Sequence, residues 1–226
     1  MPLICPRLLR ALSLSAGLAA LAAPAAAQGE PPGFYGTLYV QFSRLGSTSF
    51  DESGGGGLGP GLKASFGSGV GFGGDLGYRY GNGWAAEVEW NYRRHDLDAL
   101  RSGGATVATE GDYASNTLFV NGLRRFAGPA SGWTPYLGAG IGWVQEIDFD
   151  IASAGVERGY SKGGALAIQL IGGVERALGT HWSLAADLRW MRVGGVGLAA
   201  EEGVTGRIGK PAYNPLSVQI GLRRRF

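Results

Sequence analysis

The sequence predicts an all-β protein, an eight-stranded antiparallel β-barrel whose strands cross a membrane. Three observations lead to this prediction. Apolar and polar side chains alternate over several segments of about ten residues. Glycine, which disfavours helices, accounts for 42 of the 226 residues. Short and long connections between the segments also alternate, as expected for a barrel whose two rims differ.

The first 27 residues have the pattern of a cleaved signal peptide. Two arginines precede an apolar stretch, 11–23, and three alanines at 25–27 supply a cleavage site. Residues 28–226 would then form a single mature domain. The alternative is an uncleaved inner-membrane anchor over 8–27, but the small residues at its end favour cleavage.

Composition disfavours several classes of protein. The net charge of +2 is too small to indicate nucleic-acid binding. The only cysteine, Cys5, lies in the segment to be removed, so we expect no disulfide and no cysteine metal site in the mature chain. The glycine-rich stretches 54–57 and 69–74 lack the strand-to-helix context of a phosphate or dinucleotide loop, and we expect no cofactor.

Eight segments carry the alternation. The clearest is 84–93, where Trp84, Val88 and Trp90 alternate with Glu87 and other polar residues. The eight predicted strands are 34–43, 70–80, 84–93, 116–126, 134–144, 165–175, 182–191 and 216–226.

Two phases of alternation compete in the fourth predicted strand. Leu118 and Val120 share a face in one phase, whereas Phe119 and Leu123 share a face in the other. We place Leu118, Val120 and Phe126 on the outer face.

The connections predict how the barrel is oriented. Short turns, at 81–83, about 128–132 and 179–181, follow the second, fourth and sixth strands. The other four connections are long, roughly 20 residues or more, and rich in glycine, serine, alanine and charge. This pattern predicts short periplasmic turns, four long external loops and both termini on the periplasmic side. The last strand, 216–226, must pair with the first to close the barrel.

Side-chain volume predicts which face meets lipid. The interior of an eight-stranded barrel is just wide enough for side chains to fill. One face of the strands carries five tryptophans, and the other is rich in glycine; the tryptophans are Trp84, Trp90, Trp143, Trp182 and Trp190. We therefore place the bulky face outside, against lipid. The alternative is a soluble, lipocalin-like barrel with its apolar face turned inward.

The same phase sends five acidic and five basic side chains into the lumen. Buried charges are tolerated when they are paired, so we expect a structural network that plugs the barrel. The alternative is a gated pore in which these pairs line an aqueous path. The predicted lumen charge network is Asp75, Arg79, Glu87, Glu89, Arg93, Glu175, Asp187, Arg189, Arg223 and Arg225.

Three segments resemble a known family. Residues 135–142 (PYLGAGIG), 172–175 (GGVE) and 221–226 (GLRRRF) look like the small outer-membrane β-barrel family, which includes OmpA-like transmembrane domains, opacity-type surface proteins and "porin family" proteins. The resemblance covers nearly all of the mature chain. It implies the outer membrane of a Gram-negative bacterium and contact with its lipid and lipopolysaccharide. It also implies delivery by periplasmic chaperones to the barrel assembly machinery, for which the terminal Phe226 resembles the assembly signal.

The chain departs from this family at two points. Arg224 stands where such endings more often have an apolar or aromatic residue, and we expect it to extend toward the periplasmic interface beside Phe226. No peptidoglycan-binding domain follows Phe226, so we do not expect the cell-wall tethering role of some family members.

Enzymatic and metal sites have little support in the sequence. Some eight-stranded outer-membrane barrels are lipid A deacylases or acyltransferases that use serine and histidine. Here His181, with Ser183 on the same side of its strand, and His95, beside two aspartates at 96 and 98, are the only histidines. We expect both to be ordinary polar turn residues, with no catalytic or metal site.

The expected function is therefore structural, with surface interaction through the external loops. A small channel for ions or small solutes and a lipid A-modifying hydrolase remain as alternatives.

Overall fold

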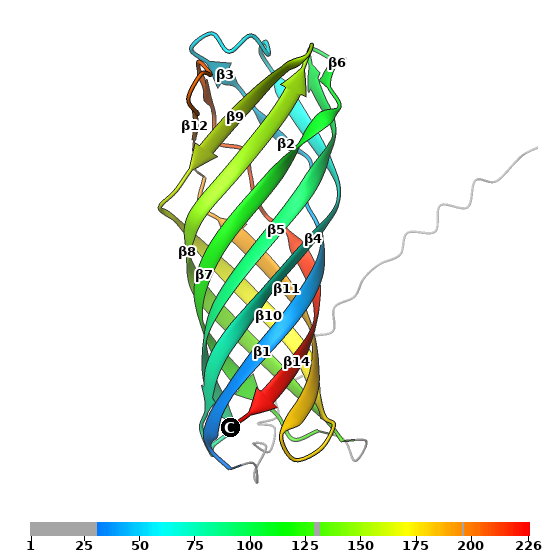
Figure 1. Cartoon of the computed structure of the whole chain (residues 1–226), viewed down its shortest axis with the longest axis vertical. Helices are drawn as coiled ribbons and strands as arrows, with labels where there is room; N and C mark the ends of the chain where they lie inside the picture. Colours follow the sequence, from blue (N-terminus) through cyan, green and yellow to red (C-terminus); the bar gives the residue numbers. More distant parts are fainter. Residues whose placement is uncertain (1–30, 129–131, 196) are drawn as a thin grey trace, which may run out of the picture.

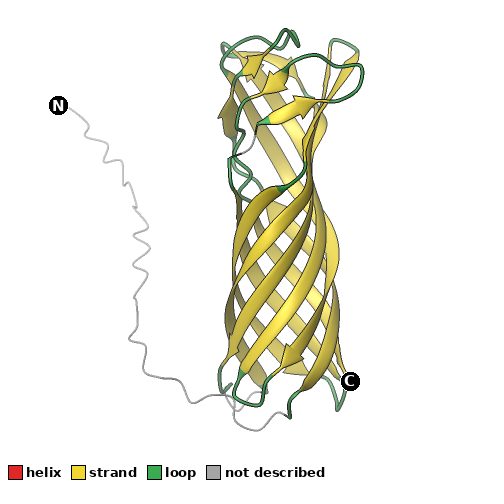
Figure 2. Cartoon of the chain, turned by 90° about the vertical axis from the view of Figure 1, so that its left-hand side faces the viewer, coloured by secondary structure: helices red, strands yellow, loops and turns green. Residues whose placement is uncertain are grey.

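Antiparallel strands close into a tall barrel (Figures 1 and 2). The computed structural model describes residues 31–128, 132–195 and 197–226. The predicted signal peptide, 1–27, lies outside these residues and stays a prediction. Within the described ranges, no helix is long and apolar enough to span a membrane.

Eight strands form the closed ring, as predicted. Each pairs with its two neighbours in antiparallel register, and the ring closes through the pairings β14 with β1 and β8 with β10. The eight are β1 (Gly33–Arg44), β4 (Leu62–Arg79), β5 (Trp84–Ser102), β7 (Glu110–Arg125), β8 (Trp133–Ser153), β10 (Ala165–Ala177), β11 (Trp182–Val193) and β14 (Leu216–Arg225).

The predicted pairing of the first strand with the last is confirmed. The register runs from Tyr35 opposite Arg225 to Arg44 opposite Leu216. The start of β1 and the end of β14 therefore lie at the same end of the barrel as the three short turns, and we call this end the turn rim. The opposite end is the loop rim.

Four strands extend farther toward the loop rim than predicted, whereas the loop-rim ends of the other four agree with the prediction to within two residues. The second predicted strand begins at Leu62 rather than near 70, and the fourth begins at Glu110 rather than at 116. The third continues to Ser102 and the fifth continues to Ser153. Much of the predicted long loops is therefore β-structure. Six short strands complete this end: β2 (Thr48–Phe50), β3 (Glu52–Ser53), β6 (Ala105–Ala108), β9 (Val156–Lys162), β12 (Leu198–Ala200) and β13 (Arg207–Ile208).

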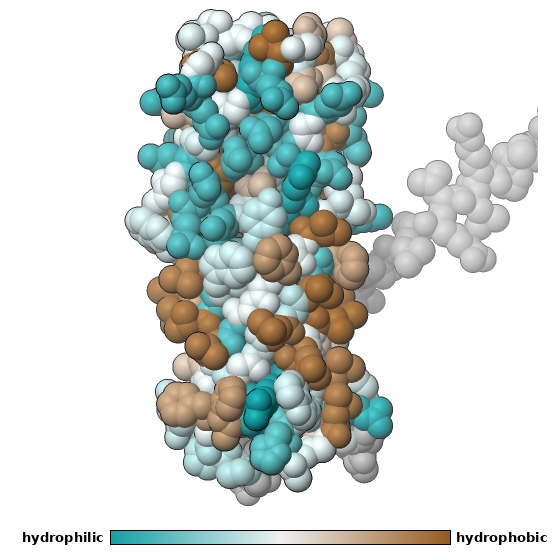
Figure 3. Space-filling view, in the orientation of Figure 1, coloured by the Kyte–Doolittle hydropathy of each residue, from teal (hydrophilic) through white to brown (hydrophobic). Residues whose placement is uncertain are grey.

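The outer face of the strands changes from apolar to polar toward the loop rim, which explains why the full length of these strands was not predicted. In the half of the barrel near the turn rim, apolar side chains point outward: Leu38 is 78% exposed and Ile141 is 72% exposed. Near the loop rim the alternation continues, but Leu62 and Leu97 point inward and Lys63 points outward. Figure 3 shows the apolar side chains gathered on the lower half of the barrel and hydrophilic ones on the upper half.

The predicted lipid-facing phase of the strands agrees with this arrangement. Leu118 and Val120 are exposed on the outer face, as predicted, whereas Phe119 and Leu123 are buried inside. The fourth strand therefore has the predicted phase. Exposing such a belt of apolar side chains to water would be energetically unfavourable. The belt is therefore consistent with a membrane around the turn-rim half.

Glycines on the inner face of β4 make room for tyrosines from β1. A Cβ atom at Gly73 would collide with the Tyr39 ring, and one at Gly77 would collide with the Tyr35 ring. Because these two glycines have no side chain, the tyrosines can lie across the narrow lumen and reach carboxylates on β5.

The loop-rim half has a hydrophobic core of its own. Phe149 lies at its centre, fully buried, with its ring centroid 5.7 Å from that of Phe50, 5.8 Å from that of Phe66 and 5.0 Å from that of Tyr113. Leucine, isoleucine and valine side chains surround these rings. This end of the barrel is therefore packed like the interior of a water-soluble domain.

We expect Phe149→Ala to loosen the loop-rim half by about 3–5 kcal/mol, because it leaves a cavity in a packed core. Hydrogen exchange of the β7, β8 and β9 amides should rise. The matched control is Phe42→Ala, which removes an equal volume from the outer face, where Phe42 is 59% exposed. An equal rise in hydrogen exchange in the two variants would contradict a specific contribution of this core to stability.

Candidate functional site

Nine of the ten predicted lumen charges are buried inside the barrel. Arg225 is the exception: it is half-buried at the turn rim, and its guanidinium donates a hydrogen bond to the Thr180 carbonyl over 2.9 Å. Arg125, which the sequence reading left out, takes its place, being 2% exposed and ion-paired to Glu175. The described residues therefore still bury five carboxylates and five guanidinium groups.

Glu175 is the centre of the charge cluster nearest the turn rim. Its carboxylate accepts hydrogen bonds from Arg79 at 3.1 Å, Arg125 at 2.7 Å and Arg223 at 2.8 Å. The Ser183 hydroxyl donates a fourth, over 2.8 Å. Three strands thus bring guanidinium groups to one carboxylate that belongs to a fourth strand, β10.

Arg223 links this cluster to the opposite wall. Its guanidinium donates to Glu87 over 2.9 Å and to the Thr37 hydroxyl over 2.8 Å, and it lies 3.9 Å from the Asp75 carboxylate. The Tyr35 hydroxyl also donates to Glu87, over 2.9 Å. Since Arg223 is 1% exposed, these contacts satisfy a cation that has lost its water.

A second cluster lies deeper in the lumen, around Glu89. Its carboxylate is ion-paired with Arg189, which also donates to Asp187 over 2.8 Å. Tyr136 donates to the same aspartate over 2.8 Å. Neutral side chains complete the shell of Glu89, with hydrogen bonds of 2.7 to 3.1 Å from Tyr39, Asn91, Asn121 and Gln169.

Arg93 marks the upper limit of the charged region. It donates to Asn91 over 2.9 Å and to the Met191 sulfur over 3.2 Å, and no carboxylate of the described residues is ion-paired with it. Above it the lumen is filled by the apolar core, beginning with Met191 and Phe119, both fully buried. Charged side chains therefore occupy one half of the lumen, and mainly apolar and aromatic side chains occupy the other.

The prediction that His95 is a polar turn residue was wrong. His95 belongs to β5, is fully buried, and has its Nε2 atom 2.8 Å from the Ser43 hydroxyl. Strand alternation points Asp96 and Asp98 to the outer face, so these carboxylates cannot converge with the imidazole on one metal ion. No metal-binding group of histidine, cysteine or carboxylate side chains occurs in the described residues.

His181 does lie in a turn, as predicted. It is exposed, and its Nδ1 atom is 2.9 Å from the Thr180 hydroxyl. Ser183, the candidate partner, points into the lumen and donates to Glu175 instead. The serine therefore faces away from the lipid that a surface hydrolase would cleave.

An acidic patch lies on the outer face of the loop-rim half, on β7 and β8. Arg94 is 3.1 Å from Asp112 in an ion pair, and Asp148 and Asp150 lie beside them. Partial burial, together with the neighbouring carboxylates, raises the pKa of Asp148 to about 7. This patch therefore gains negative charge as the pH rises through neutrality.

We expect Arg189→Met to destabilise the barrel by about 3–5 kcal/mol, because it leaves Glu89 and Asp187 buried without their cation. The matched control is Arg192→Met on the same strand, where the arginine is exposed on the outer face. Both variants lose one positive charge. Urea unfolding in lipid vesicles measures the difference, and equal stability of the two variants would contradict the role given to the ion pairs.

Comparison with known proteins agrees with this architecture. Residues 13–226 match the family described as outer membrane protein beta-barrel domain. The structure is similar to that of the outer membrane protein OprG from Pseudomonas aeruginosa, with 18% identity and a TM-score of 0.62 over 88% of this chain and 98% of that one. It is also similar to the outer membrane protein AlkL in lipid bilayers, with 18% identity and a TM-score of 0.51 over 90% of this chain and 94% of that one.

A third similar structure is Neisserial surface protein A, with 16% identity and a TM-score of 0.50 over 87% of this chain and all of that one. No curated protein matches the sequence. At these identities the solved structures establish the fold, and the family match, which spans most of the chain, establishes the relationship. The chain belongs to the outer-membrane β-barrel family.

Proposed function

We propose that this protein is a structural and surface-interacting barrel of the Gram-negative outer membrane, with a lumen that does not conduct. One observation carries the proposal: the lumen is filled along its length, first by ion pairs around Glu175 and Glu89 and then by the apolar core around Phe149. The two fillings oppose permeation by different physical means.

The charged half resists a passing ion because Glu175, Glu89 and Asp187 are already ion-paired and hydrogen-bonded. To enter, an ion would have to replace guanidinium groups held at 2.7–3.1 Å from Glu175. The apolar half resists because it is packed mainly with apolar and aromatic side chains, which cannot replace the water around an ion. A solute would have to disrupt both.

We also propose surroundings for each half of the barrel, and the family match and the polarity of the two outer faces support them. The turn-rim half lies in membrane lipid, and the loop-rim half, with its hydrophilic outer face, stands in the lipopolysaccharide layer and beyond. We propose that residues 1–27 direct export and are removed, and that Phe226 is recognised by the assembly machinery. Recognition of Phe226 is supported by its exposure, since 72% of the residue is accessible. Its backbone N–H donates a hydrogen bond to the Phe34 carbonyl.

A small channel is the second candidate, and one observation favours it. Arg93 is fully buried, its Nε atom has no hydrogen-bond partner, and no carboxylate of the described residues is ion-paired with it. A lumenal cation of this kind would attract anions if water reached it. The channel reading therefore predicts anion-selective conductance that depends on Arg93.

A hydrolase that modifies lipid A is disfavoured. His95 is enclosed in the barrel, and Ser183 is turned away from the membrane. The acyl chains of lipid A should therefore be the same by mass spectrometry in cells with and without the protein. Loss of an acyl chain that His95→Ala or His181→Ala prevents would establish the enzyme.

We expect planar-bilayer recordings of the refolded protein to show no steady conductance. Arg189→Glu and Phe149→Ala should each remain silent, because each variant leaves the other filling of the lumen in place. The double variant should leak. Steady wild-type conductance that Arg93→Met or Arg189→Glu alters would contradict the proposal and support the channel.

A further inference from the structure

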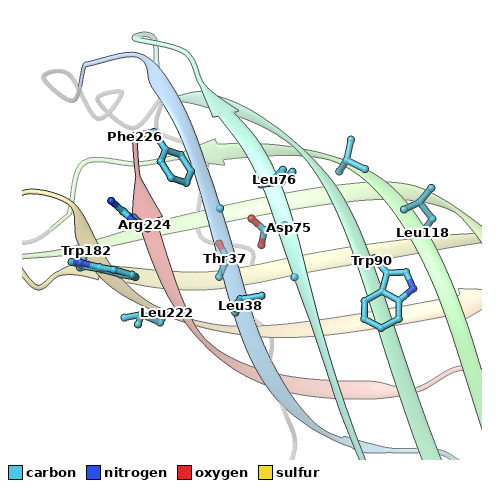
Figure 4. Close-up of a pocket in the computed structure, with 13 residues that line it drawn as sticks. Thr37, Leu38, Asp75, Leu76, Trp90, Leu118, Trp182, Leu222, Arg224 and Phe226 are labelled. Atoms are coloured by element: carbon cyan, nitrogen blue, oxygen red, sulfur yellow. The ribbon is translucent and has the colours of Figure 1, made fainter.

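A groove on the outer face of the turn-rim half has the size of a ligand site. Its volume is about 610 Å³, within the range of about 300–1,000 Å³ that is usual for small-molecule pockets. It runs across β14, β1 and β4 and is bordered by β11 on one side and β5 on the other. Figure 4 shows Leu38, Leu76, Trp90, Trp182 and Phe226 around it. The groove is open toward the lipid.

Two glycines create the depth of this groove. Gly36 and Gly74 occupy outward positions on the adjacent strands β1 and β4, where the neighbouring outward residues are large and apolar. Gly36 is opposite Leu76, and Gly74 is opposite Leu38. Beside each leucine, the glycine position leaves a trough whose floor is the backbone of the sheet. An extended alkyl chain fits such a trough.

Arg224 supplies a cation at the turn-rim end of the groove. Its guanidinium lies 5.6 Å from the ring centroid of Trp182 and 5.6 Å from that of Phe226. It forms no ion pair or hydrogen bond with any described residue, so its N–H donors are available to a ligand. An exposed arginine held between two rings is well suited to bind a phosphate group.

The depth of Arg224 in the membrane is indicated by two similar pairs. Trp84 is opposite Arg124 and Trp133 is opposite Arg176, each at the first residue of a strand that leaves the turn rim, just as Trp182 is opposite Arg224. The arginine-to-ring distances are 5.3 Å and 5.5 Å. Tryptophan and arginine concentrate at the headgroup level of a bilayer. The three arginines therefore mark the plane of the lipid phosphates.

We propose that the groove and Arg224 together form a binding site for an anionic phospholipid of the periplasmic leaflet. One acyl chain lies in the trough over Gly36 and Gly74, and the phosphate accepts hydrogen bonds from the Arg224 guanidinium. Arg176 has the same tryptophan partner geometry but does not border the groove. Arg176 is therefore a matched internal control for charge alone.

Native mass spectrometry of the refolded full chain in detergent, titrated with phosphatidylglycerol, tests the site. The wild type should retain one lipid molecule. Arg224→Gln should weaken retention about tenfold, the loss expected for a charge-assisted hydrogen bond. Arg176→Gln should change it less than about twofold. Heat-modifiable gel migration confirms that each variant is folded.

A second variant tests the apolar part without touching the charge. Gly36→Val places a side chain in the trough, where the nearest atom to the new Cβ is the mobile Leu76 Cδ2 at 3.2 Å. It should abolish retention of the lipid while Arg224 stays in place. Equal losses of lipid retention in Arg224→Gln and Arg176→Gln would overturn the proposal and indicate nonspecific electrostatic binding. Displacement by inorganic phosphate would overturn it in favour of a free-anion site, and unchanged retention in Gly36→Val would exclude the trough.

Discussion

The structure depends on one constraint: in a membrane, every backbone N–H and C=O group needs a partner within the protein. The pairing of β1 with β14 removes the last two free edges and closes the sheet. Closure has a second effect, because it forces half of the side chains of eight strands into a narrow lumen. The side chains that fit there decide what the barrel can do.

Two solutions to this packing problem meet within one sheet. Near the turn rim, Glu175 and Glu89 hold arginines from opposite walls, and tyrosines reach across the lumen over glycines of β4. Near the loop rim, Phe149 and its neighbours fill the same space with hydrocarbon. The change of filling coincides with the change in polarity of the outer face: the half with an apolar outer face has a charged interior, and the half with a polar outer face has an apolar interior.

The sequence predicted the turn-rim half well and the loop-rim half poorly, for a physical reason. Between Trp84 and Arg93 the period of two and the identity of the lipid-facing side agree, so both strand and phase could be read. Beyond Arg93 the period persists but the outer face becomes polar, as with Lys63 and Asp96, and such segments resemble loops in composition. Arg125 was missed because it follows another arginine at a strand end, and His95 because charged neighbours suggested a turn.

The strands that cross the polarity change do so without a break. β4, β5, β7 and β8 continue from the turn rim into the loop-rim half, whereas β1, β10, β11 and β14 end lower (Figure 1). The loop-rim half is thus joined to the turn-rim half by four continuous hydrogen-bonded strands rather than by a hinge. A force applied to the tip by a bound partner would tilt the whole barrel in the bilayer, and the surface contact and the lipid contact would bear the same load.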